Sequence, residues 1–160
     1  MSTSPQPIPR NQVSINTSRL WAGGVATACV AALVAYVGVL VCRDVLKVAL
    51  TRPPILLDLG WSISGDYAAT AFVCALAATG LAHALAATTP RPRVFFGWIV
   101  ALVTVASMVP PFASSAPMAS KVSTAAINLA VGVAIGTLLT AVLSRTVVDT
   151  EGSWKKQPGR

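Results

Sequence analysis

Residues 20–42, LWAGGVATACVAALVAYVGVLVC, contain no charged side chain and decide the class of this fold. A helix needs about 20 apolar residues to cross a hydrocarbon core of about 30 Å. This stretch meets that length, and Arg19 and Arg43 flank it as charged residues flank a membrane span. The apolar core of a cleaved signal peptide is only about 7–15 residues long. We therefore predict that residues 20–42 form a permanent transmembrane helix.

Three further apolar stretches predict three more spans, over residues 67–89, 94–112 and 122–144. The stretch that begins at Val94 is unbroken only to Val109, because Pro110 and Pro111 follow. We expect this helix to end near Phe112, with a short loop over residues 113–120. The expected fold is an all-α membrane protein, a four-transmembrane-helix bundle over residues 19–145.

The composition fits lipid as the solvent. Hydrophobic residues make up 54% of the chain and charged residues 11%, whereas a soluble domain carries about 25% charged residues. The net charge of +7 comes from residues that flank the apolar stretches. A nucleic-acid-binding protein would gather its basic residues on a folded face with stacking aromatic side chains. We therefore expect membrane lipid as a partner and no nucleic acid.

The basic residues also predict the orientation. Four spans place both termini on one side, which carries eight positive residues, whereas the opposite side carries four. Positive residues concentrate in the cytoplasm, so we expect a multi-pass plasma-membrane protein with cytoplasmic N- and C-termini. Residues 1–18 are polar, contain three prolines and are expected to form a disordered cytoplasmic tail. Residues 146–160 are expected to form a basic cytoplasmic tail.

The extracytoplasmic loop between the first two spans covers residues 43–66. Two short apolar runs, residues 45–50 and 55–59, are joined by Pro53 and Pro54. This pattern is typical of a β-hairpin, and a short interfacial helix before the prolines is the alternative.

Residues that carry chemistry are scarce. The chain has one histidine, its three cysteines form no closely spaced pair, and its five acidic residues fall outside the predicted spans. No motif for nucleotide binding, zinc hydrolysis or nucleophilic catalysis is present. We therefore expect no catalytic, cofactor or metal site and no enzymatic activity. His83 is a weak polar candidate, which we expect to hydrogen-bond to backbone or to a neighbouring helix.

The last span carries a packing signal. Small or hydrogen-bonding residues recur there every four positions and share one helix face, which suits close helix contact in a membrane. Two interpretations of this face remain open. It packs inside this bundle, or it contacts a protein partner or a second copy through the fourth helix. The residues of this face are Asn128, Gly132, Gly136, Thr140 and Ser144.

From Gly65 onwards the chain has an Ala/Leu-rich second span followed by several short motifs, namely Arg91-Pro92-Arg93, Trp98-Ile99-Val100, Ser107 with Pro110, Ala119-Ser120-Lys121-Val122, Asn128-Leu129-Ala130-Val131-Gly132 and Leu143-Ser144-Arg145. With these motifs the chain resembles a family of uncharacterised actinobacterial four-helix integral membrane proteins. The resemblance implies an actinobacterial plasma membrane and brings no activity with it.

These observations favour a non-enzymatic accessory or structural subunit of a larger cell-envelope membrane complex. The alternative is a transporter or binder of an apolar small molecule or lipid. Such a site needs no charged group inside the membrane, so the scarcity of polar residues allows both.

Overall fold

The computed structural model describes residues 17–48, 50, 59–89 and 91–146. Its elements are α1 (Thr17–Leu40), a π-helical turn η1 (Val41–Val45), α2 (Ile63–Thr88), α3 (Pro92–Met108), α4 (Pro110–Ala113) and α5 (Met118–Thr146). Every regular element in these ranges is a helix, and four helical stretches are long and apolar enough to cross a membrane. The prediction of an all-helical chain with four such helices is therefore confirmed. The two predicted tails lie almost wholly outside the described residues.

The second long helix begins earlier than the predicted residue 67. Ser62 caps α2, since its Oγ accepts a hydrogen bond of 3.2 Å from the Gly65 N–H. A capping serine satisfies one of the backbone donors that the first turn of a helix leaves open. Asp66, which we expected to lie before the span, is therefore part of the first turn of α2.

The two prolines break the third stretch without ending it. Pro110 and Pro111 have no N–H, so α3 ends at Met108 and the Val109 N–H bonds to the Ala106 carbonyl at 3.3 Å. The chain then continues as α4, and the apolar helical stretch reaches Ala113, close to the predicted end at Phe112. The predicted loop over residues 113–120 is shorter than expected, because residues 118–120 already belong to α5.

The predicted β-hairpin is not confirmed. Val45 ends η1, which extends the first helix beyond residue 42, and Leu46 keeps a helical conformation. The helix ends as the Val48 N–H bonds to the Cys42 carbonyl at 2.9 Å and Lys47 adopts a left-handed φ of 54°. The first half of the hairpin therefore does not begin as a strand. Residues 51–58, which contain most of its second half, lie outside the described residues.

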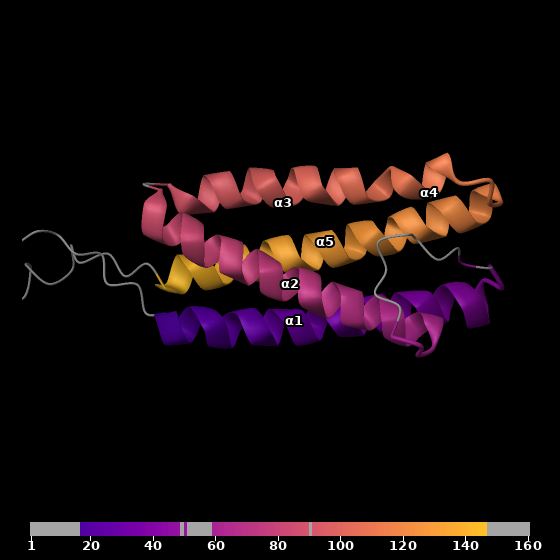
Figure 1. Cartoon of the computed structure of the whole chain (residues 1–160), viewed down its shortest axis with the longest axis horizontal. Helices are drawn as coiled ribbons and strands as arrows, with labels where there is room; N and C mark the ends of the chain where they lie inside the picture. Colours follow the sequence, from indigo (N-terminus) through magenta and orange to yellow (C-terminus); the bar gives the residue numbers. More distant parts are fainter. Residues whose placement is uncertain (1–16, 49, 51–58, 90, 147–160) are drawn as a thin grey trace, which may run out of the picture.

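Three long helices lie side by side along the bundle, in the order α1, α5, α3, and α2 crosses them obliquely (Figure 1). α1 packs against α2 and α5, whereas α3 packs mainly against α5. The buried faces of α1 and α2 are lined by alanines such as Ala28, Ala31, Ala75 and Ala82, which let the two backbones approach closely. The first described turn of α1 and the last turn of α5 lie at the same end of the bundle (Figure 1).

Candidate functional site

Asn128 joins α5 to the broken end of α3. Its Nδ2 donates a hydrogen bond of 2.7 Å to the backbone carbonyl of Ser107. In an uninterrupted helix this carbonyl would accept from the N–H of residue 111, which is a proline and has none. The amide of Asn128 replaces the missing donor, as side chains on neighbouring helices commonly do where proline interrupts a membrane helix.

This arrangement predicts that Asn128 is needed only because Pro111 is present. Asn128→Leu leaves the Ser107 carbonyl without its donor and should lower the free energy of unfolding by about 1 kcal/mol. In a Pro111→Ala background residue 111 regains its N–H, so the same substitution should cost nearly nothing. Thermal melts of the four proteins in one detergent give the coupling energy. An equal cost in both backgrounds would show that Asn128 acts in another way.

Gly132 and Gly136 lie against α3 of the same chain. A Cβ added to Gly132 would lie 2.9 Å from the Cβ of Thr104 and closer still to its Oγ1 and Cγ2. A Cβ added to Gly136 would lie 3.3 Å from Val100 Cγ1. The two glycines thus form the groove in which α3 rests, and α3 covers both positions in the single chain.

The remaining predicted residues are Thr140, Ser144 and His83. Thr140 is half-buried, and Ser144 is exposed and donates to the Ala141 carbonyl of its own helix at 2.7 Å. His83 is half-buried near the last turns of α2, and its buried Nδ1 has no hydrogen-bond partner among the described residues. The expected bond from His83 to backbone or a neighbouring helix is therefore absent at Nδ1.

A buried polar cluster that the sequence analysis missed lies where α2 and α5 begin. Asp66 is fully buried in the first turn of α2, and the phenol of Tyr67 interacts with Thr124 of α5. The helix dipole favours a negative charge at this position of α2. Ser62, a typical capping residue, was the signal that α2 begins early enough to include Asp66. The cluster consists of Ser64, Asp66, Tyr67, Ser120 and Thr124, none more than 5% exposed.

This cluster supplies oxygen atoms but no histidine or thiolate ligand set. In the part of the chain that the structure describes, no three His, Cys, Asp or Glu side chains gather as a metal site would require. The three cysteines are free thiols, with Cys42 buried and Cys29 and Cys74 exposed. The cluster lies where the start of α2 meets the start of α5, through Tyr67 and Thr124.

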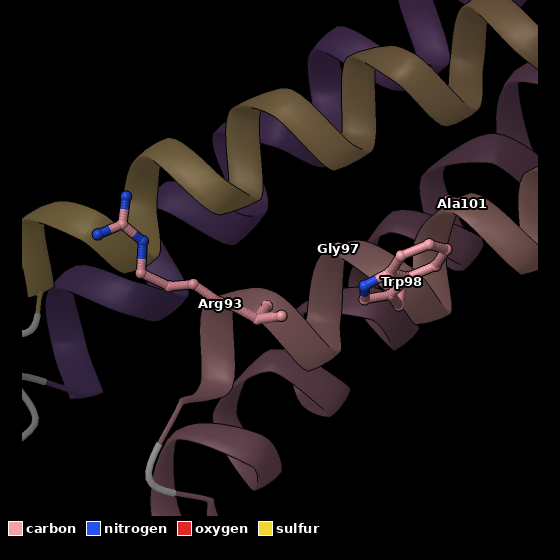
Figure 2. A pocket seen from close by; sticks show the side chains of 5 residues that line it. Arg93, Gly97, Trp98 and Ala101 are labelled. Carbon is pink, nitrogen blue, oxygen red and sulfur yellow. The ribbon is translucent and has the colours of Figure 1, made fainter.

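The other candidate is a shallow groove of about 360 Å³ on the flank of α3. Its lining residues come from successive turns of this one helix, and Trp98 on its rim is 67% exposed. Gly97 leaves the groove open, since a Cβ at this position would meet no atom within 4 Å. Figure 2 shows the Arg93 side chain extending from the start of α3 toward α5. The groove is lined by Arg93, Val94, Gly97, Trp98 and Ala101.

Comparison with known proteins assigns the chain to a family without assigning an activity. Neither a curated protein nor a solved structure matches it. Residues 15–146, which include all four long helices, match a family described as a family of unknown function. The chain therefore belongs to this family of unknown function, DUF6069.

Proposed function

We propose that this chain is a non-enzymatic plasma-membrane protein that binds a lipid on the outside of its helix bundle. The observation that carries the proposal is the open groove on the flank of α3, which combines an arginine, a tryptophan and a glycine. In the proposed orientation, which the distribution of basic residues predicts, both termini are cytoplasmic and Arg93 lies near the cytoplasmic surface. An actinobacterial origin remains part of this proposal.

Close packing inside the bundle favours surface binding over transport. A Cβ on Gly24 would lie 2.6 Å from Thr79 Oγ1, and one on Gly38 would lie 3.2 Å from Ile127 Cγ1. The contacts between α1, α2 and α5 thus leave little room for a ligand at these levels. An apolar ligand fits better in the groove of α3, where Gly97 leaves space that no neighbouring side chain fills.

A second candidate function is an accessory subunit of a larger envelope complex. The face of α5 that carries Gly132 and Gly136 is covered by α3, so a partner or second copy would need the outward side of α5. Small side chains that would let a partner helix approach closely are exposed there, at Ala126, Ala130, Thr137 and Ala141.

Purification from native membranes in a mild detergent, with mass spectrometry of the bound lipids and proteins, tests both candidates. We expect wild type to retain a lipid and Gly97→Leu to lose it, because leucine fills the groove. Gly80→Leu is the matched control, since a Cβ on Gly80 of α2 also meets nothing within 4 Å. Melting temperatures of both variants verify that each one folds.

Two outcomes would contradict lipid binding in this groove. If wild type carries no lipid but a stoichiometric protein that Ala130→Leu releases, the accessory-subunit function replaces the proposed one. If Gly97→Leu and Gly80→Leu retain equal amounts of lipid, the groove does not bind it.

A further inference from the structure

We propose that the groove on α3 binds an anionic phospholipid, whose phosphate lies on Arg93 and whose acyl chain follows Gly97 and Ala101. This inference rests on the proposed function and names its ligand.

The spacing of the lining residues fits one leaflet. Arg93, Gly97 and Ala101 lie four residues apart, so they follow one another along the same face of α3. The distance from Arg93 to Ala101 is about 12 Å at 1.5 Å per residue. Half of a hydrocarbon core is about 15 Å thick. A chain that starts at the headgroup level could therefore lie in this groove over most of its leaflet.

Gly97, Ala101 and the indole of Trp98 give the groove a shape that fits an acyl chain. Gly97 has no side chain and Ala101 only a methyl group, so an acyl chain can lie close to the backbone of α3. Trp98 stands on the rim with 67% of its surface exposed. Tryptophan prefers the region where the hydrocarbon meets the headgroups. Its position, five residues or about 7.5 Å below Arg93, suits the upper part of an acyl chain.

The charge distribution favours an anionic headgroup. Arg19, Arg91, Arg93 and Arg145 lie at this end of the bundle, without a carboxylate among the described residues. At the other end, Asp44 and Asp66 accompany the basic residues Arg43, Lys47 and Lys121. Of the four arginines only Arg93 lines the groove. Guanidinium binds phosphate through two parallel hydrogen bonds. A zwitterionic headgroup would bring its own positive charge next to the arginines, whereas an anionic one would not.

The test measures lipid retention by the full chain in detergent, using native mass spectrometry with phosphatidylglycerol and phosphatidylcholine as probes. We expect wild type to retain phosphatidylglycerol preferentially. Arg93→Gln should reduce its retention roughly tenfold, because one charge-assisted contact to phosphate is lost. Arg91→Gln is the matched control, as it removes the same charge from the same turn without touching the groove. Gly97→Leu should abolish retention of both lipids.

Each alternative outcome overturns a defined part of the proposal. Equal retention of phosphatidylglycerol by Arg93→Gln and Arg91→Gln overturns the headgroup assignment, while the lipid-binding function stands if Gly97→Leu still removes the lipid. Equal retention by Gly97→Leu and wild type overturns both. Inorganic phosphate that displaces phosphatidylglycerol at equal concentration would show a site for a free anion and not for a lipid.

Discussion

Gly132→Leu should destabilise the protein by about 3 kcal/mol, at the upper end of what overpacking usually costs. The reason is the contact with Thr104, whose side chain occupies the space that a Cβ on Gly132 would need. Thr104 is nearly fully buried and donates its hydroxyl to the Val100 carbonyl at 2.7 Å. Its side chain therefore cannot rotate away without losing this bond, and α3 must move away from α5. Melting curves in one detergent measure the loss.

Three companion variants make the result specific. Val133→Leu, on an exposed part of α5, should behave like wild type. Gly136→Leu should cost less than Gly132→Leu, because it meets a single atom of Val100 at 3.3 Å. Thr104→Ala should restore part of the stability of Gly132→Leu, since it removes the two nearest atoms. If Gly132→Leu and Val133→Leu have the same melting temperature, the close contact between α3 and α5 does not exist in the protein.

The sequence was sufficient to predict four helices that are long and apolar enough to cross a membrane, and the reason is physical. In hydrocarbon, backbone N–H and C=O groups must hydrogen-bond to one another, and a helix satisfies them within a single stretch. Four long apolar stretches are therefore expected to be helical. The four-residue repeat on α5 likewise marked Gly132 and Gly136 as packing positions. It could not indicate which helix they contact, because a repeat within one helix carries no information about its neighbour.

Long-range contacts account for most of what the sequence left open. The bond from Asn128 to Ser107 joins residues 21 positions apart, although Pro111 already implied that the Ser107 carbonyl lacks a donor. The burial of Asp66 depends on how the start of α2 packs in the bundle, where Tyr67 meets Thr124 near the start of α5. The groove beside Gly97 exists because α3 is packed mainly by one helix, so its other sides stay open. None of these follows from the composition of a single span.

The contact between α1 and α2 should be as sensitive as that between α3 and α5. A Cβ added to Gly24 would lie 2.9 Å from the Cβ of Thr79 and 2.6 Å from its Oγ1. Thr79 is fully buried, and its hydroxyl donates to the Ala75 carbonyl at 2.8 Å. Gly24→Leu should therefore force α1 and α2 apart and destabilise the protein by about 3 kcal/mol. Gly24→Ala should produce a smaller loss of the same sign.

The sign of the alanine effect separates packing from helix propensity. In an exposed helix, replacing glycine by alanine stabilises by up to about 1 kcal/mol. Gly80→Ala, at the open position of α2, should show that gain as a higher melting temperature. Gly24→Ala should show the opposite, because the added methyl group meets Thr79. A stabilising effect at both positions would mean that α1 and α2 lie farther apart than this contact requires, and that the alanine-lined core does not hold the two helices in close contact.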